Sequence, residues 1–412
     1  MADNAFNMIK SIRLDNFFSF KDTTINFKKG TNFLVGINGS GKSNIIKAVQ
    51  LLKQGVRGNA DGNALQALIT SWGGFESIQC QSDVNHEYNE SINIEFTFDK
   101  EKLNQFNKYD FHNDVTYIIR IIKKPSFENY TLSEKLMSGN YLLMDFFNGS
   151  GLISEKIKGR SKIKLNKHEN YPPQEMILSS ISEIDQDKFY PLVSFKTAIK
   201  SINFYYNFDT SSRSPIRKSN IATSSIATLN SNGDNLSQLL NTIKLKDKPI
   251  FRKIINHISD INENFLGFDF NYFGSSGMLE LMLDEKNMNK SIHVSHISDG
   301  TLKYFCLLLI LCNPNRGKFV CIDEPEAGLH PDMLINIAEL IKEASQDTTF
   351  LISTHSDILL NNFNINEVIV LEKNTQNCTI VNKHTEEDFK GWYEEFFPGR
   401  MWRDGDLGGN RW

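Results

Sequence analysis

A glycine-rich loop near the start of the chain constrains the fold more than any other feature. The apolar run 32–35 leads into Gly36-Ile37-Asn38-Gly39-Ser40-Gly41-Lys42-Ser43, and residues 43–56 carry apolar positions at helical spacing. This order fits the pattern GxxxxGK[ST] in the strand, loop and helix context that the pattern requires. Glycines let the backbone wrap an anion closely, and the helix N-terminus directs N–H groups at it. The alternative, a chance glycine loop, is disfavoured because strand, loop and helix are all in register.

Two polar side chains at the end of this loop have distinct expected roles. We expect Lys42 to bridge the β- and γ-phosphates of a nucleotide, and the Ser43 hydroxyl to ligate Mg²⁺. The sequence therefore predicts an α/β core that binds a nucleoside triphosphate together with Mg²⁺.

A second apolar run ends in two acids. Residues 319–322 precede Asp323 and Glu324. We expect Asp323 to hold Mg²⁺ through water and Glu324 to polarise the attacking water. Because Pro325 follows, the pair also fits a helix-capping turn, but the phosphate loop in the same chain favours the metal and catalytic roles.

Two further segments fit the same kind of site. His355 follows the apolar run 350–352, at the carboxyl end of an expected strand, where open α/β sheets bind ligands. It can reach the γ-phosphate or the attacking water, although a lone histidine is more often an ordinary structural residue. Ser298, Asp299 and Gly300 precede a helix; they form either a simple capped helix start or a second phosphate-binding device that serves the nucleotide of a partner subunit.

Composition indicates a globular chain and excludes several classes of protein. Of the 412 residues, 40% are hydrophobic and 23% charged, and the net charge is −4, so any nucleic-acid contact needs a local basic patch. Five scattered cysteines without paired spacing disfavour a disulfide framework or a zinc site. The chain start lacks a secretory apolar region, and no apolar run approaches the roughly 20 residues that span a bilayer. We expect a cytoplasmic protein without a membrane partner.

Patterning along the chain divides it into three parts. We expect a split nucleotide-binding core at 1–100 and 290–375, a compact α/β lid-like insertion at 101–289 with a basic strand and a polar loop, and an aromatic C-terminal tail at 376–412. Alternation of strands and helices after residue 293 predicts a parallel sheet with helices packed on it. Sustained heptads are absent from the sequence, which excludes a long coiled coil.

The order of these motifs resembles the ABC-type ATPases of the RecF, SMC and Rad50 branch. Gly36–Ser43 resembles the Walker A motif, Ile297–Thr301 a degenerate signature motif, Val320–Glu324 the Walker B motif and Glu324–Pro331 the following segment with the D-loop, while His355 matches the switch histidine. The resemblance implies an ABC-type head with a mixed sheet and ATP as nucleotide. It implies that ATP contacts Gly36, Asn38, Gly39, Ser40, Gly41, Lys42, Ser43 and Asn44 in one subunit and Ser298, Asp299 and Gly300 in the other.

The same resemblance carries expectations about assembly, with two departures. It implies a dimer that closes head to tail on ATP, or a higher even oligomer. A Q-loop glutamine is not evident, since Gln79 and Gln81 are candidates by position alone. Asp299 replaces the first signature glycine and puts an acid near the expected γ-phosphate. A narrower resemblance is to stand-alone RecF-like AAA-type ATPases of bacterial antiphage systems, Septu-type and retron-associated, which implies a separate nuclease or other effector as partner.

Two patches outside the core admit two interpretations each. Basic side chains recur at every second position in 156–164, so on one strand they would share a face that grips DNA phosphates without reading sequence; they are Lys156, Lys158, Arg160, Lys162 and Lys164. The alternative is a solvated edge strand protected by lysines.

Three of the four tryptophans, Trp392, Trp402 and Trp412, lie in the last 21 residues. Such a tail either docks on its own core or forms a protein interface.

Three functional hypotheses follow from these motifs. The first is an ATP-hydrolysing sensor subunit that controls a separate effector in an antiphage complex. The second is a DNA-repair ATPase that loads on gapped or broken DNA. The third is a nucleotide-dependent scaffold with little turnover, because Asp299 would slow hydrolysis.

Overall fold

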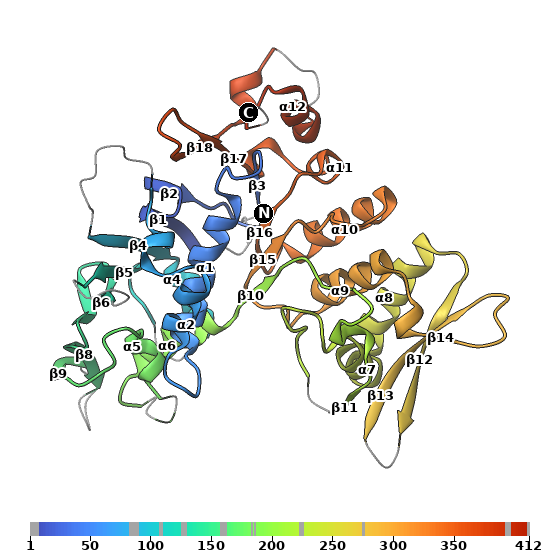
Figure 1. Ribbon diagram of the computed structural model, residues 1–412, viewed down its shortest axis with the longest axis horizontal. Coiled ribbons are helices and arrows are strands. Elements are labelled where there is room, and N and C mark those ends of the chain that lie inside the picture. Colours follow the sequence, from blue (N-terminus) through green and yellow to red (C-terminus); the bar gives the residue numbers. More distant parts are fainter. Residues whose placement is uncertain are drawn as a thin grey trace.

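The computed structural model describes residues 8–81, 90–106, 110–124, 130–156, 163–182, 184, 187–221, 226–273, 277–391 and 397–409. A central core separates two lobes, and the C-terminal segment lies at the top of the view in Figure 1. Among the described residues, no helix is long and apolar enough to cross a membrane.

The central sheet has six strands in the order β10-β15-β16-β3-β17-β18. Its strands are β3 (Thr31–Val35), β10 (Ile202–Tyr205), β15 (Phe319–Asp323), β16 (Thr349–Ser353), β17 (Val368–Lys373) and β18 (Thr379–Lys383). The first five run parallel, and β18 pairs antiparallel with β17. The structure confirms the expected mixed α/β sheet, and the carboxyl ends of β3, β15 and β16 meet at one edge.

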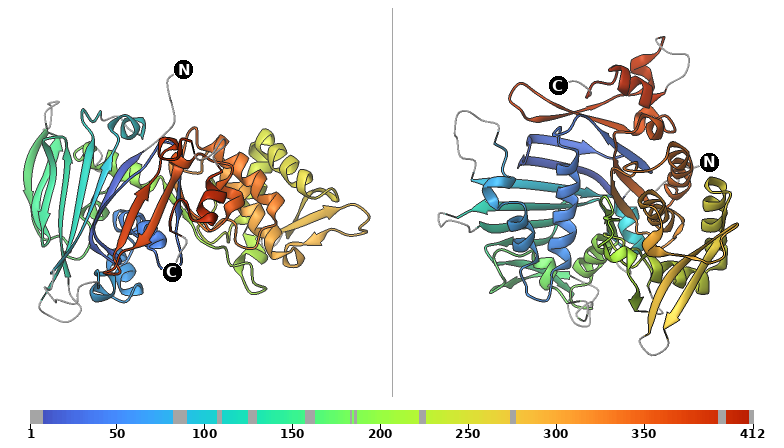
Figure 2. Two further views of the ribbon diagram at one scale, coloured as in Figure 1. Left: turned by 90° about the horizontal axis from the view of Figure 1, so that it is seen from above. Right: turned by 45° about the vertical axis from the view of Figure 1, so that its right-hand side comes forward.

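An antiparallel sheet of eight strands forms the first lobe, in the order β2-β1-β4-β5-β6-β7-β8-β9. Its strands are β1 (Ile9–Phe17), β2 (Phe20–Asn26), β4 (Ser91–Phe98), β5 (Val115–Lys123), β6 (Tyr130–Ser138), β7 (Tyr141–Phe147), β8 (Ser150–Lys156) and β9 (Ile163–His168). The helices of this lobe are α1 (Lys42–Arg57), α2 (Ala64–Ser71), α3 (Phe75–Ile78), α4 (Lys100–Leu103), α5 (Ile177–Ser180) and α6 (Tyr190–Lys200). Figure 2 shows α1 lying along this sheet.

The second lobe carries four long helices and a small sheet. The helices are α7 (Leu236–Lys246), α8 (Lys248–Ile261), α9 (Asp299–Cys312) and α10 (Pro331–Ala344), followed toward the C-terminus by α11 (Asp357–Leu360) and α12 (Pro398–Asp404). The sheet comprises β11 (Asn220–Ile221), β12 (Phe265–Phe273), β13 (Met278–Glu285) and β14 (Ile292–His293).

Alternation along the central strands divides the interior into two cores. On β3, Leu34 belongs to the core shared with α1 and the antiparallel sheet, whereas Phe33 and Val35 belong to the core shared with α7, α9 and α10. On β15, Phe319 and Cys321 face the first core and Val320 faces the second. Successive side chains of a strand point to opposite faces, so these strands, buried on both faces, are mainly apolar, with buried polar residues near their ends such as Asn32 and Ser353.

The division into core, insertion and tail does not coincide with these sheets. The segment expected as one insertion supplies β5–β9 to the antiparallel sheet, β10 to the central sheet and β11–β13 to the second lobe. The segment expected as a tail supplies β18 to the central sheet. Strand pairing joins residues that are distant in the chain, and local patterning does not encode which sheet a strand enters.

The expected basic strand requires a correction. Lys156 ends β8 and Lys164 lies in the neighbouring strand β9, where Lys164 pairs with Glu155 and Lys156 with Ile163. Because directly paired residues share a face and adjacent ones alternate, Lys156 and Lys164 project from opposite faces. The other three positions, Lys158, Arg160 and Lys162, lie outside the described residues. Lys156 and Lys164 therefore do not share one strand face, because they belong to two antiparallel strands.

The described part of the C-terminal segment docks on the chain itself. Met401 and Leu407 are buried in the second core, and Trp402 packs against it. The Arg403 guanidinium lies 2.8 Å from the Asp357 carboxylate on α11. Trp392 and Trp412 lie outside the described residues.

Candidate nucleotide-binding site

The glycine loop forms a tight turn between β3 and α1. Gly36, Gly39 and Gly41 have φ values of 150°, 81° and 111°, which side-chain-bearing residues rarely adopt. A Cβ on Gly36 would lie 2.3 Å from the Leu371 carbonyl oxygen, so the loop has room for glycine alone at this position. The positive φ values give the loop the tight curvature with which a backbone can wrap a phosphate group.

Lys42 begins α1 and is buried over the loop. Its Nζ donates hydrogen bonds to the carbonyls of Gly36 (2.8 Å) and Ile37 (3.2 Å). Burial lowers the pKa of Lys42, while the nearby carboxylates of Glu324 and Asp323 favour its charged form. The ammonium group therefore lies between the loop and the Walker B acids, as a phosphate-bridging lysine requires.

The hydroxyls of Ser19 and Thr379, which are distant in the sequence, form hydrogen bonds that support this loop. Thr379 on β18 donates a 2.7 Å hydrogen bond to the Ser40 carbonyl, and its Oγ1 also lies 2.7 Å from Ser19 Oγ. The Asn44 amide donates to Ser19 Oγ (3.0 Å). Asn44, expected to contact the nucleotide, thus binds the turn between β1 and β2. No sequence signal marked Ser19 or Thr379.

Asp323 and Glu324 lie where β15 ends beside β16. The Ser353 hydroxyl donates to the Asp323 carboxylate, which fixes its orientation. The Glu324 N–H donates to the Ser353 carbonyl (3.0 Å), and Glu324 has a φ of 49°, in the left-handed region that a non-glycine residue rarely occupies. Strain of this kind is typical of functional sites, where surrounding contacts hold the residue in place.

His355 joins these acids from the next strand. Its Nε2 lies 3.8 Å from Glu324 Oε1, and its backbone N–H donates to Glu326 Oε1 (2.5 Å). Burial lowers the pKa of His355, and the positive charge of Lys42 acts in the same direction. The indole of Trp402 lies against the imidazole with ring centroids 6.2 Å apart. The imidazole therefore lies beside both the Glu324 carboxylate and the Trp402 indole.

The oxygen donors suit Mg²⁺. The Ser43 hydroxyl is exposed at the start of α1, and the Asp323 carboxylate is partly exposed beside Lys42. Hydroxyl, carboxylate and phosphate oxygens are the hard ligands that Mg²⁺ prefers. Ser43 and Asp323 would hold the ion, and their role as Mg²⁺ ligands stays a prediction.

The signature segment lies in the second lobe, at the start of α9. Ser298 caps the helix by accepting a hydrogen bond from the Thr301 N–H (3.2 Å). Gly300 packs so closely on Gly328 that an added Cβ would lie 2.6 Å from the Gly328 carbonyl. The Asp299 carboxylate lies 2.5 Å from the buried Arg217 guanidinium, a contact that sequence reasoning missed.

The two Q-loop candidates occupy a short turn after α3. The side-chain amide of Gln81 donates a hydrogen bond to the Glu76 carbonyl (2.7 Å). Gln79 is the C-cap residue of α3 and forms an isolated β-bridge with Phe17. Neither contact reaches the residues of the glycine loop.

The sequence matches the protein family described as "AAA domain, putative AbiEii toxin, Type IV TA system" over residues 31–140 and 145–361, which together exceed half of the chain. The chain belongs to this family. With the geometry above, it is an ABC-type ATPase of the RecF, SMC and Rad50 branch.

Short segments of curated proteins are similar to this chain. A DNA double-strand break repair Rad50 ATPase of Methanococcus maripaludis is 46% identical over 52 residues, which cover 13% of this chain and 5% of that protein. A structural maintenance of chromosomes protein 3 homolog of Plasmodium falciparum is 53% identical over 45 residues, covering 11% of this chain and 4% of that protein. The matches thus span about a twentieth of each relative.

Solved structures of SMC heads share the fold along nearly the whole chain. A crystal structure of an SMC head bound to the C-winged helix domain of ScpA aligns with a TM-score of 0.59 at 16% identity, covering 93% of this chain and 99% of that one. An SMC head domain with an extended coiled coil, bound to the C-terminal domain of ScpA derived from Pyrococcus furiosus, aligns with a TM-score of 0.56 at 15% identity, covering 92% and 97%. At these identities the likeness concerns the fold.

Proposed function

We propose that this chain hydrolyses ATP with Mg²⁺ and that two copies close head to tail on the nucleotide. The observation that carries the proposal is the convergence of Lys42, Glu324 and His355 from three neighbouring strand ends, with Nε2 of His355 3.8 Å from Oε1 of Glu324. A phosphate-bridging cation and a carboxylate base are groups that phosphoryl transfer to water uses, and an imidazole beside the base can help to position the attacking water.

Each group has a defined task in the proposed reaction. Lys42 neutralises charge on the β- and γ-phosphates, and the Glu324 carboxylate accepts a proton from the attacking water. Bound Mg²⁺, held by Ser43 and Asp323, would neutralise charge that develops on the phosphate oxygens. Burial lowers the pKa of His355, which disfavours its cationic form and so weakens any ion pair with the Glu324 carboxylate.

The signature segment is proposed to complete the site of the opposite copy. Ser298, Asp299 and Gly300 lie at the N-terminus of a helix of 14 residues, whose dipole favours an anion. The decisive experiment measures ATP-dependent dimerisation of Glu324→Gln by light scattering, with Lys42→Ala as the control that binds ATP more weakly and should dimerise only at higher ATP concentrations. A Glu324→Gln protein that binds ATP and stays monomeric would refute the dimer.

We further propose that the ATPase regulates a separate effector, such as a nuclease, in an antiphage complex. The family description, which names a toxin of a toxin–antitoxin system, supports this role. The test is gentle purification of the tagged protein from its native operon, followed by mass determination. A stoichiometric effector supports the role, whereas a homodimer carrying DNA refutes it.

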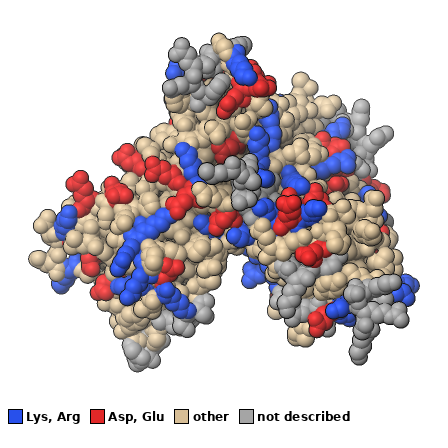
Figure 3. Space-filling view, turned by 180° about the vertical axis from the view of Figure 1, so that it is seen from behind, with Lys and Arg blue, Asp and Glu red and all other residues tan. Residues whose placement is uncertain are grey.

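A DNA-repair ATPase is the second candidate, favoured by similarity to segments of Rad50 proteins named for double-strand break repair. The face in Figure 3 carries several groups of basic side chains separated by acidic and uncharged surface. Lys156 and Lys164 remain candidate DNA contacts, from opposite faces of their sheet. This hypothesis predicts DNA-stimulated turnover that falls steeply with salt, and salt-insensitive turnover with DNA would exclude it.

A near-inert scaffold is the third candidate, and two variants separate it from an active ATPase. For a scaffold, Lys42→Ala abolishes assembly while Glu324→Gln leaves function intact. For an ATPase whose hydrolysis is needed, both variants abolish function in cells.

A further inference from the structure

The turn that precedes α9 is wrapped around one buried arginine. Arg217 lies in a short 3₁₀ turn, Pro215–Arg217, and its side chain is only 7% exposed. Its Nη1 donates to the carbonyls of Val294 (3.3 Å), Ser295 (3.0 Å) and Ile297 (2.7 Å). Three carbonyls of one short turn therefore converge on a single nitrogen.

The same guanidinium makes two further contacts. Its Nε donates to the Thr210 carbonyl (2.7 Å), and its Nη2 lies 2.5 Å from Asp299 Oδ1. Arginine presents its donors in a rigid planar fork, and no other side chain can hold carbonyls and a carboxylate at these fixed angles. Without the guanidinium, the buried carbonyls of Thr210 and Ile297 would lose this donor, at a cost that favours another path for the turn.

This contact accounts for the acid in the signature segment. The Asp299 side chain is 68% exposed at the helix N-terminus, where a free carboxylate would repel the phosphates of a nucleotide. The positive charge of Arg217 compensates the negative charge of the Asp299 carboxylate, and the contact directs one carboxylate oxygen toward the buried guanidinium. Asp299 thus fastens the N-terminus of α9 to the turn that Arg217 organises.

We propose that Arg217 is the positioning residue of the signature segment, and that Asp299 completes a latch which presents Ser298 and Gly300 to the nucleotide of a second copy. The proposal rests on the ATP-bound dimer proposed above. It predicts that loss of the latch weakens closure of the dimer without weakening binding of ATP to the glycine loop of a single copy.

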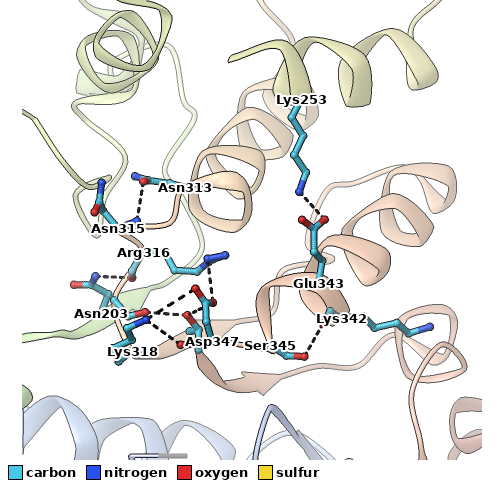
Figure 4. Close-up of polar contacts among 12 residues, drawn as sticks. Asn203, Lys253, Asn313, Asn315, Arg316, Lys318, Lys342, Glu343, Ser345 and Asp347 are labelled. Carbon is cyan, nitrogen blue, oxygen red and sulfur yellow. Dashed lines mark hydrogen bonds and ion pairs between the residues drawn. The ribbon is translucent and has the colours of Figure 1, made fainter. Parts of the chain in front are cut away.

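The chain offers a matched control, a second pair of arginine and carboxylate that lies away from the signature segment. Arg316 is also buried, with an 8% exposed side chain, and its Nη1 lies 3.4 Å from Asp347 Oδ1 (Figure 4). Asp347→Ala therefore removes an arginine-paired carboxylate that has no contact with the signature segment among the described residues.

The experiment uses the full-length Glu324→Gln protein as background and adds Asp299→Ala, Asp299→Glu, Arg217→Lys or Asp347→Ala. We expect Asp299→Ala and Arg217→Lys to weaken ATP-dependent dimerisation at least tenfold in sedimentation, with binding of a fluorescent ATP analogue within twofold of background. Asp299→Glu keeps a carboxylate and should retain most of the dimerisation, and Asp347→Ala should retain all of it. Equal dimerisation of the Glu324→Gln background and its four added variants would refute the proposed latch.

Hydrogen exchange in the monomer gives a second, independent measurement. The latch predicts faster exchange of the amides at 297–302 in Asp299→Ala, with exchange of α1 unchanged; unchanged exchange at 297–302 would refute the latch. If the background protein binds ATP without dimerising, the dimer proposal fails, and this exchange measurement still decides whether Arg217 and Asp299 hold the turn. Because Asp299 is exposed, its substitution should leave the fold intact even if Arg217→Lys does not fold.

Discussion

Nε2 of His355 lies 3.8 Å from Oε1 of Glu324, although the two residues follow different strands of the central sheet. The parallel pairing of β15 with β16 brings them together, because Asp323 pairs with Ser353 in the register and each chain then turns over the same edge. The strand register therefore sets the geometry of the proposed catalytic pair.

Replacing the base should separate binding from turnover. Glu324→Gln keeps the shape of the side chain and removes its capacity to accept a proton, so ATP hydrolysis should fall about 100-fold or more, as expected for loss of a general base. ATP affinity, measured with a fluorescent analogue, should change less than threefold. Glu339→Gln, on the exposed face of α10, is the control. Unchanged turnover in Glu324→Gln would remove Glu324 from the mechanism.

Loss of the buried lysine should act on binding itself. Lys42→Ala removes a charge-assisted contact to phosphate, and we expect ATP affinity to fall about 10- to 100-fold, the range for such a contact. Isothermal titration of ATP with Mg²⁺ measures the change. Arg57→Ala, an exposed change at the other end of α1, should leave affinity unaltered. Equal affinity in Lys42→Ala and wild type would contradict the proposed site.

Trp402 is expected to influence catalysis through His355. Trp402→Ala removes the indole that packs on the imidazole, and we expect kcat to fall about tenfold with KM within twofold, because small displacements of catalytic groups are costly. Trp402→Phe should restore most of the rate by filling the same space. The partly exposed Phe397 provides a control substitution to Ala. A change in KM alone would indicate a role in binding.

A buried carboxyl group should make stability depend on pH. Burial raises the pKa of Glu134 to about 7, although the Tyr117 hydroxyl and the Ile177 N–H both donate to it. Its folded-state pKa lies above the unfolded value, so the folded protein holds its proton more tightly. The free energy of unfolding should therefore fall as pH rises from about 4.5 to 7, by about 3 kcal/mol from this group.

Urea denaturation of wild type and Glu134→Gln at pH 5.5 and pH 8 tests this dependence. Glutamine stays neutral, so the variant should lose less stability than wild type on going to pH 8. Glu175→Gln is a poor control, because Glu175 accepts from the N–H groups of Leu65 and Gln66 at the start of α2. The exposed Glu339→Gln serves instead. Identical pH slopes in wild type and Glu134→Gln would contradict the assignment.

Local sequence determined the glycine loop, the central parallel strands and the order of the motifs. The backbone demands of a phosphate loop are met by eight consecutive residues, Gly36–Ser43, and strands buried on both faces are mainly apolar. The same local reasoning failed at Lys156 and Lys164, because no periodicity reveals that the chain reverses between them. Residues 101–289 supply strands to three sheets, and local patterning does not show which sheet each strand joins.

Tertiary structure alone decided which distant groups support these motifs. Thr379 meets Ser19 across 360 positions of the chain, and Arg217 meets Asp299 across 82. A hydroxyl or a guanidinium gains such a role only when folding buries it beside carbonyls and carboxylates that need a partner. The sequence by itself thus determined the chemistry of the phosphate loop and its acids, whereas the packing of strands and lobes determined what holds that chemistry in place.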